Sequence, residues 1–113
     1  MSKYHARKVV ADGLTFASQA EYYDYLKLRD REEHGEISGL RLQPRYLLQA
    51  AFVYRGQKVA KIEYVADFEF LEDGVTVAWD TKGGTATMTP VFRLKLKLAQ
   101  ARYPQIEFRV VSS

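Results

Sequence analysis

The sequence has no cysteine. This absence excludes a disulfide framework and a thiolate zinc site, so the fold depends on packing alone. The sequence also lacks a long apolar run at its beginning, because residues 1–8 are basic and contain no segment suited to a signal peptide or a membrane anchor. We therefore expect a cytoplasmic protein with no membrane partner.

Internal repeats, low-complexity tracts and Pro/Gly-rich linkers are also missing, and every interruption is short enough to be a turn. The sequence therefore predicts a single domain over residues 1–113, with residues 1–12 as a basic N-terminal arm. Hydrophobic residues make up 47% and charged residues 27% of the chain, which is ordinary globular composition. The net charge of +3 is compatible with a polyanionic partner, although many proteins that never touch nucleic acid share it.

The first structural signal is a capping-box pattern at residues 18–21, in which Ser18 is followed three positions later by Glu21. Helix-forming residues with spaced aromatic and aliphatic side chains follow, and Gly35 ends the pattern. Together these signals predict a helix from Ser18 to His34.

Extended segments are predicted next, each ended by turn or breaker residues. They are Leu40 to Gln43, ended by Pro44; Tyr46 to Tyr54, ended by Arg55-Gly56; Ile62 to Leu71; and Val75 to Thr81, ended by Gly83-Gly84. Because Asp73-Gly74 is a tight-turn signal, the last two segments are predicted to pair as a hairpin. Alternation along the third segment directs Asp67 away from its aromatic face.

Residues 91–98 alternate as a strand would, although most of them also favour helices. Thr89 and Pro90 suit the N-cap and first helical position, and the pattern runs to Arg102, which is longer than a typical strand, so we predict a helix. Ile106 to Val111 predicts a final strand. The order of elements indicates an α/β fold with a mixed β-sheet flanked by helices.

Two acidic residues and one lysine form the candidate catalytic group. Phosphodiester hydrolysis needs a divalent cation, and hard cations such as Mg²⁺ prefer carboxylate oxygens. The predicted hairpin places Asp67 and Asp80 on adjacent strands, where they can share one face of the sheet. Lys82 is two residues beyond Asp80 and emerges on the same face, where it can orient a water or stabilise developing charge. The backbone carbonyl of Thr81 can complete the metal ligands.

A plain structural alternative exists for this group, because an Asp and a Lys two positions apart on a strand often form a solvated ion pair. The surroundings favour chemistry instead. Asp67 lies among strongly apolar neighbours and Asp80 follows Trp79, so an idle carboxylate at either position would have to be desolvated.

At these residues the sequence resembles the PD-(D/E)XK nuclease superfamily, and more narrowly a set of small phage and prophage nucleases long catalogued as a domain of unknown function. The resemblance covers nearly the whole chain. The matching pieces are Lys3-Tyr4-His5, Phe16-Ala17-Ser18, Gly35-Glu36-Ile37-Ser38, Leu42-Gln43-Pro44, Tyr64-Val65-Ala66-Asp67-Phe68, Asp80-Thr81-Lys82-Gly83 and Tyr103-Pro104-Gln105-Ile106-Glu107-Phe108.

The resemblance implies a restriction-endonuclease-like core in the order α-β-β-β-α-β and a Mg²⁺ or Mn²⁺ site. It assigns the metal acids to Asp67 and Asp80, the motif lysine to Lys82, and a further metal-site carboxylate to Glu21 on the first helix. The alternative role for Glu21 is that of capping partner to Ser18, and the two roles compete for one carboxylate.

DNA contact is expected from basic residues beside the sheet, although each of them can equally belong to a solvated face. These are Lys3, Arg7 and Lys8 in the arm and Arg93, Lys95 and Lys97 in the second predicted helix. Gln43 can contact the site or the DNA, or can be a buried amide at a strand end. Residues 83–87 lack bulky side chains, so a phosphate backbone can approach Lys82 there, or the segment can be a flexible connection. His5 and His34 are residue types that serve as metal ligands or general bases, but each is isolated, and we expect ordinary surface histidines.

The function that follows is a Mg²⁺-dependent deoxyribonuclease, an endonuclease that cuts branched or otherwise structured phage DNA in the manner of a Holliday-junction resolvase, in the bacterial host cytoplasm. The alternatives are an exonuclease or nicking nuclease of the same superfamily, and a DNA-binding module that does not cut. A chain of this size offers little surface to embrace branched DNA, so a homodimer is expected.

Overall fold

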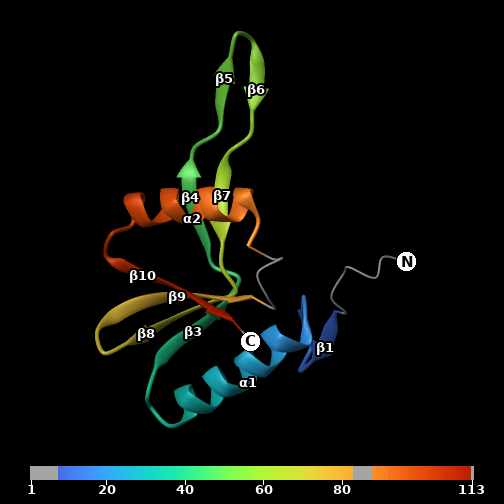
Figure 1. Cartoon of the computed structure of the whole chain (residues 1–113), viewed down its shortest axis with the longest axis vertical. Coiled ribbons are helices and arrows are strands. Elements are labelled where there is room, and N and C mark those ends of the chain that lie inside the picture. Colours follow the sequence, from blue (N-terminus) through green and yellow to red (C-terminus); the bar gives the residue numbers. More distant parts are fainter. Residues whose placement is uncertain (1–7, 83–87, 113) are drawn as a thin grey trace.

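A computed structural model of the protein describes residues 8–82 and 88–112. At its centre is a four-stranded mixed sheet in the order β10-β9-β8-β3 (Figure 1). The strands are β3 (Ser38–Leu42), β8 (Phe68–Glu72), β9 (Val75–Lys82) and β10 (Ile106–Ser112). β10 runs parallel to β9, whereas β3, β8 and β9 pair antiparallel. With helices α1 (Gln19–Glu33) and α2 (Pro90–Arg102), this confirms the predicted mixed sheet with flanking helices.

Six further strands form three pairs outside the central sheet. They are β1 (Val9–Ala11) with β2 (Leu14–Phe16), β4 (Arg45–Gln49) with β7 (Ile62–Val65), and β5 (Phe52–Tyr54) with β6 (Gln57–Val59). β1 lies within the predicted N-terminal arm, so the last part of that arm is a strand. The Asp12-Gly13 turn that creates it was not predicted, although it carries the same turn signal as Asp73-Gly74.

The predicted strand from Ile62 to Leu71 is wrong as a single strand, because it is divided at Ala66 and Asp67. Its first part pairs with β4 and its second part with β3 and β9. At the division, the Ala66 N–H donates to the Pro44 carbonyl and the Asp67 N–H donates to the Trp79 carbonyl. The backbone thus changes partners at Asp67. The predicted strand from Tyr46 to Tyr54 is likewise divided, at residues 50–51.

Local signals at the turns and helix ends are confirmed. Arg55-Gly56 and Asp73-Gly74 are two-residue turns in which both residues have positive φ, as hairpins with a right-handed twist require. Ser18 caps α1 by accepting a hydrogen bond from the Glu21 N–H, and Thr89 caps α2 by accepting one from the Phe92 N–H.

Two hydrophobic clusters lie on opposite faces of the central sheet. One cluster packs beneath α1 and includes Phe16, Tyr25, Leu28, Phe68, Phe70 and Val77. The other packs beneath α2 and the β4–β7 pair and includes Tyr46, Tyr64, Ala66, Ala78 and Ala99. The neighbours Val77 and Ala78 belong to different clusters because successive side chains of a strand point to opposite faces. Asp80 follows Ala78 by two positions and therefore lies on the α2 face.

No helix in residues 8–82 and 88–112 is long and apolar enough to cross a membrane.

Candidate active site

Asp67 and Asp80 lie close together at the end of the β8–β9 pairing. Phe68 and Trp79 are the last pair of that ladder. The Asp67 N–H donates to the carbonyl of the same Trp79 at 3.0 Å, so the backbone of Asp67 stays bonded to β9 just before β8 begins. The Thr81 N–H, next to Asp80, donates to the Asp67 carboxylate, and the Asp80 charge acts on that carboxyl. The structure therefore brings the two predicted acids together.

The closeness of the two carboxylates changes the protonation of Asp67. Burial, and after it the negative charge of Asp80, raise the pKa of Asp67 to about 8, against the Thr81 N–H, which lowers it. That N–H donates to Oδ2 of Asp67 at 2.7 Å. Two like charges held this close retain a proton between them unless a cation takes its place. The pair is thus suited to bind a divalent cation.

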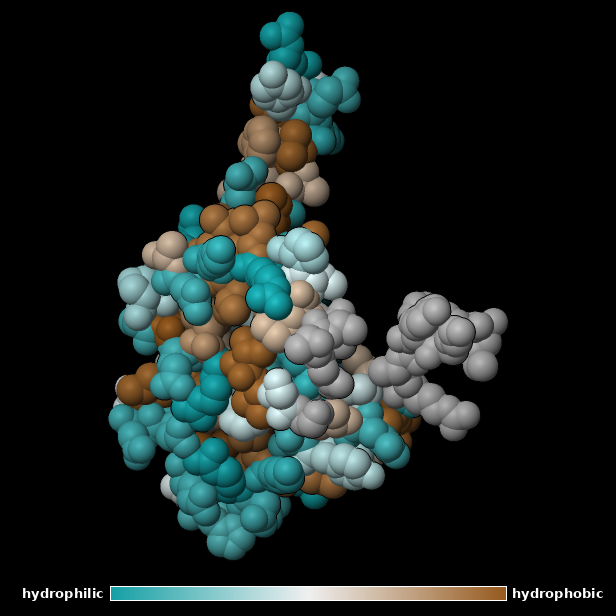
Figure 2. Space-filling view, viewed as in Figure 1, coloured by the Kyte–Doolittle hydropathy of each residue, from teal (hydrophilic) through white to brown (hydrophobic). Residues whose placement is uncertain are grey.

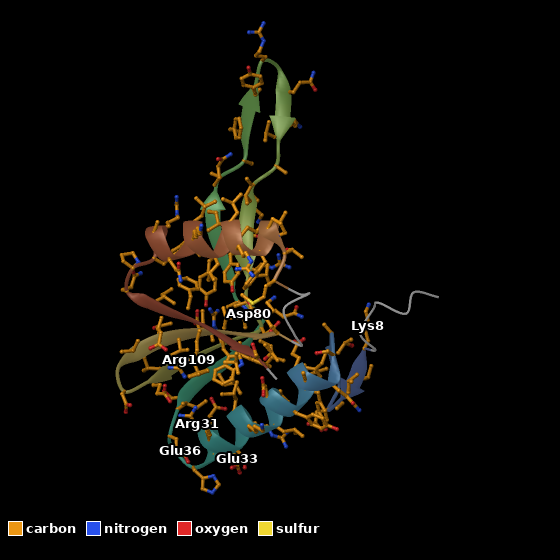
Figure 3. All side chains as sticks on the ribbon, viewed as in Figure 1. Lys8, Arg31, Glu33, Glu36, Asp80 and Arg109 are labelled. Carbon is orange, nitrogen blue, oxygen red and sulfur yellow. The ribbon has the colours of Figure 1, made fainter. Side chains whose placement is uncertain are left out.

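Asp80 is held in place by a buried tyrosine. The Tyr64 hydroxyl donates to Oδ2 of Asp80, and only 4% of Asp80 is exposed. Burial raises the pKa of Tyr64, and the Asp80 charge raises it further, so the phenol keeps its proton and remains the donor. Figure 3 places Asp80 between α2 and the central sheet. Tyr64 fixes one carboxylate oxygen and leaves Oδ1 for another partner.

Lys82 supplies the positive charge beside Asp80. Its Nζ lies 3.5 Å from Oδ1 of Asp80 and 3.9 Å from the centroid of the Phe92 ring in the first turn of α2. Both contacts are on the α2 face of β9, so the prediction that Asp80 and Lys82 share a face is confirmed. The aromatic ring holds the ammonium group by a cation–π interaction without neutralising it.

Glu21 caps the helix and also faces the site. Its Oε2 accepts a hydrogen bond of 3.1 Å from the Ala17 N–H. In a capping box the donor would be the N–H of the N-cap residue itself, Ser18, so the observed bond is shifted by one residue. Burial raises the pKa of Glu21; in addition, the charge of Asp80 raises it and that of Lys82 lowers it. The Glu21 carboxylate therefore caps the helix and also interacts electrostatically with Asp80 and Lys82.

Within the parts of the chain that are described, no three His, Cys, Asp or Glu side chains are grouped so as to hold a metal ion by themselves. The donor set is therefore two carboxylates, Asp67 and Asp80, with Glu21 nearby. Mg²⁺ fits such a set, because it commonly binds one or two carboxylates and takes its remaining ligands from waters and substrate phosphates. An extended backbone directs the C=O of a residue to the same side as its N–H, which turns the Thr81 carbonyl toward the Asp67 side.

Asp24 is a second buried acid of α1 that sequence reasoning missed. Its Oδ2 accepts a 2.7 Å hydrogen bond from the Thr81 hydroxyl, whose oxygen also accepts one from the Trp79 indole N–H at 3.1 Å. Since the Thr81 N–H donates to Asp67, both the backbone and the side chain of Thr81 are held by hydrogen bonds. The missed signal was spacing: Glu21, Asp24, Tyr25 and Leu28 form the buried stripe of α1 at helical intervals, and two of its members are acids.

We expect the Asp24→Ala variant to lose about 1–3 kcal/mol of unfolding free energy, because it leaves the Thr81 hydroxyl without its acceptor. Asp24→Asn keeps an acceptor at the same place and should lose less. Urea unfolding of both variants measures the difference, with Glu33→Ala on the exposed face of the same helix as the control. Equal stability of Asp24→Ala and Glu33→Ala would show that this hydrogen bond does not order Thr81.

Gln43 lies beside Asp67 through its backbone. Its N–H donates to the Asp67 carbonyl at 2.8 Å, and its φ of 51° lies in the left-handed region that residues other than glycine seldom adopt. Gln43 is exposed, so the alternative of a buried amide is wrong. A backbone held in this conformation next to a candidate catalytic acid is typical of functional sites.

The remaining predicted residues are spread over the molecule. Arg93 and Lys97 are exposed and Lys95 is half-buried, all on α2; Lys8 is exposed beside β1 (Figure 3). His34 is exposed at the far end of α1, where its Nδ1 lies 2.8 Å from the Asp30 carbonyl, which agrees with a surface histidine. Lys3, His5, Arg7 and the loop of residues 83–87 lie outside the described residues.

Comparison with known proteins gives a family match over the whole chain. The family model described as "Protein of unknown function (DUF1064)" matches residues 1–113. No curated protein matches the sequence.

Proposed function

The chain belongs to the DUF1064 family, and from the geometry of its site we propose that it is a metal-dependent DNA nuclease of the PD-(D/E)XK superfamily. The observation that carries the proposal is the group of Asp67, Asp80 and Lys82, in which the Asp80 charge raises the pKa of Asp67 and the Lys82 ammonium lies 3.5 Å from Asp80. The succession α1, β3, β8, β9, α2, β10 also agrees with the restriction-endonuclease-like core of that superfamily.

In this proposal Asp67, Asp80 and the Thr81 carbonyl hold Mg²⁺ or Mn²⁺, and Glu21 assists from α1. Such a cation, when bound, offsets phosphate charge and makes a water molecule more acidic. Lys82 stabilises the negative charge that develops on the phosphate oxygens and orients the attacking water. The water oxygen bonds to phosphorus as the bond from phosphorus to the 3′ oxygen breaks, which leaves a 5′ phosphate and a 3′ hydroxyl.

We further propose that the substrate is branched or otherwise structured DNA, cut in the host cytoplasm by a homodimer that presents two sites. The support for a dimer is the size of the chain, since a monomer of 113 residues has little surface for a branched substrate. A mass measurement in solution tests the dimer independently of any activity.

The purified protein is expected to cut DNA with Mg²⁺ or Mn²⁺ and to lose this activity in EDTA. The assay uses linear, nicked, flapped and four-way DNA, with the ends of the products mapped. Preference for the four-way substrate supports a junction-resolving enzyme, whereas equal cutting of all four defeats the branch preference, and release of single nucleotides indicates an exonuclease. Binding without cutting under every metal condition would overturn the nuclease proposal in favour of a DNA-binding module.

A further inference from the structure

The β5–β6 hairpin projects from the body of the protein. It continues beyond the β4–β7 pair and forms a two-stranded sheet of its own, whose tip is the Arg55-Gly56 turn (Figure 1). The molecule measures 52 Å along its longest axis and 27 Å along its shortest. An isolated two-stranded hairpin is marginally stable in water, so a projecting one needs a reason to exist.

Large apolar side chains of this hairpin are exposed. The exposed fractions are 43% for Phe52, 67% for Val53 and 62% for Tyr54. Figure 2 shows hydrophobic surface along the projecting hairpin below a hydrophilic tip. Cross-strand pairing places Phe52 and Tyr54 on one face of the ribbon and Val53 with Lys58 on the other. Both faces therefore offer contact surface, as expected of a ribbon that a partner surrounds.

The positive charge of the part of the molecule that carries the hairpin, formed by residues 44–65 and 88–103, favours a negatively charged partner. Residues 44–65 contain four basic residues and one acid, and residues 88–103 around α2 contain four basic residues and no acid. By contrast, residues 19–36 around α1 contain six acids and three basic residues. The single acid of the hairpin half, Glu63, is paired with Arg45 and Lys61. Across the described ranges, neither Arg55 nor Lys58 forms an ion pair.

We infer that the β5–β6 hairpin enters the groove of duplex DNA beside the cutting site, an inference that rests on the proposed nuclease function. The DNA major groove admits a two-stranded β-ribbon. Arg55 and Lys58 contact phosphates at its walls, while Phe52 and Tyr54 lie against sugars and thymine methyl groups. A two-fold contact in which this half meets the same half of a second copy fits less well, because both surfaces are positively charged and poor in acids.

The reach of the hairpin sets the length of DNA it needs. From Val65, two residues before Asp67, β7 and β6 lead back over eight residues to Gln57 near the tip, a rise of at most about 26 Å at 3.3 Å per residue. At 3.4 Å per base pair this corresponds to about eight base pairs. The hairpin therefore reaches DNA up to roughly three-quarters of a turn away from the phosphate at Asp80.

The test is the affinity for DNA of the Arg55→Asn/Lys58→Gln variant, measured in EDTA so that no cutting occurs. Asn followed by Gly suits the turn, so the hairpin is kept. With duplexes of 30 base pairs we expect the affinity to fall on the order of 50-fold at 0.1 M salt. The slope of log affinity against log salt concentration should also decrease by the amount that about two phosphate contacts contribute. The control Lys27→Gln, exposed on the acidic α1 side, should bind as the wild type does.

The alternative outcomes separate this inference from the proposed function. If the wild type cuts DNA and the Arg55→Asn/Lys58→Gln variant binds DNA with unchanged affinity, the hairpin contact is overturned and the nuclease proposal stands. Weakened binding by a protein that never cuts supports the hairpin and overturns the nuclease proposal, and a wild type that binds no DNA overturns both. A variant whose mass in solution falls from dimer to monomer, with unchanged affinity per protomer, assigns the hairpin to a second copy instead.

Discussion

The Asp80→Asn variant is expected to cut DNA about 1,000-fold more slowly than the wild type, or worse, while remaining folded and able to bind DNA. Asparagine keeps an oxygen that accepts the Tyr64 hydroxyl, so the buried contact survives. It removes the negative charge that Asp80 would share with Asp67 to hold a cation and that Lys82 faces at 3.5 Å. Single-turnover cutting with Mn²⁺ and DNA binding in EDTA measure the two properties separately.

The structure also supplies a matched control for this experiment. Glu69 is a partly buried carboxylate on a neighbouring strand that accepts a 2.6 Å hydrogen bond from the buried Tyr46 hydroxyl. Glu69→Gln therefore repeats the chemical change of Asp80→Asn outside the site and should leave cutting intact. Asp80→Ala is the poorer choice, because an unpaired Tyr64 hydroxyl costs about 1–3 kcal/mol.

Lys82→Met extends the same prediction to the lysine. The methionine side chain can still lie over the Phe92 ring, but it carries no charge, so we expect cutting to fall on the order of 100-fold. Wild-type cutting rates in both Asp80→Asn and Lys82→Met would show that the active site lies elsewhere.

The Asp67→Asn variant is expected to be more stable than the wild type at pH 8 without metal, and inactive. The pKa of Asp67 is raised to about 8 in the folded protein from 3.8. A carboxyl group whose pKa is higher in the folded protein than in the unfolded chain stabilises the folded protein at pH values below its unfolded-state pKa. This stabilisation is lost as the pH rises through the folded-state pKa. Each pKa unit corresponds to about 1.4 kcal/mol; partial exposure reduces this, so we expect a gain of about 2 kcal/mol at pH 8.

Thermal unfolding from pH 4 to pH 8 checks this prediction. The wild type should lose stability relative to Asp67→Asn across that window. Mn²⁺ at 100 times its dissociation constant should then stabilise the wild type by about 2.7 kcal/mol and leave Asp67→Asn unchanged. A wild type more stable than Asp67→Asn at pH 8 without metal would mean that Lys82 already neutralises an ionised Asp67.

The local elements were predictable because their signals lie within a few residues. Ser18 and Thr89 begin helices through bonds to N–H groups three positions ahead, and the Asp73-Gly74 turn sets the register that pairs Phe68 with Trp79, one residue from each acid. Alternation along β9 correctly predicted that Lys82 lies on the same face as Asp80. Residues 67–82 therefore contained the local signals that bring the candidate catalytic residues near one another.

Contacts between distant segments were not predictable in this way. Nothing in the run from Ile62 to Leu71 indicates that its backbone leaves β4 at Ala66 and joins β9 at Asp67, because the choice depends on which strands lie alongside. The bond from Thr81 to Asp24 spans 57 positions, and the one from Tyr64 to Asp80 spans 16. In the sequence Asp24 is an ordinary helix residue and Tyr64 an ordinary core residue, so neither indicates its distant partner.

The sequence by itself determined that Asp80 and Lys82 share a face and that the turn brings Asp67 near them, because strand alternation and a two-residue turn leave little freedom. Only the tertiary structure decided their electrostatic state. Burial and the charges of Asp80 and Glu21 raise the pKa of Asp67, and the Tyr64 hydroxyl orients Asp80. Burial and the contacts with Glu21 and Tyr64 depend on packing between segments far apart in the chain. The same packing directs the β5–β6 hairpin outward, where its charge and exposed aromatic residues meet the solvent or a partner.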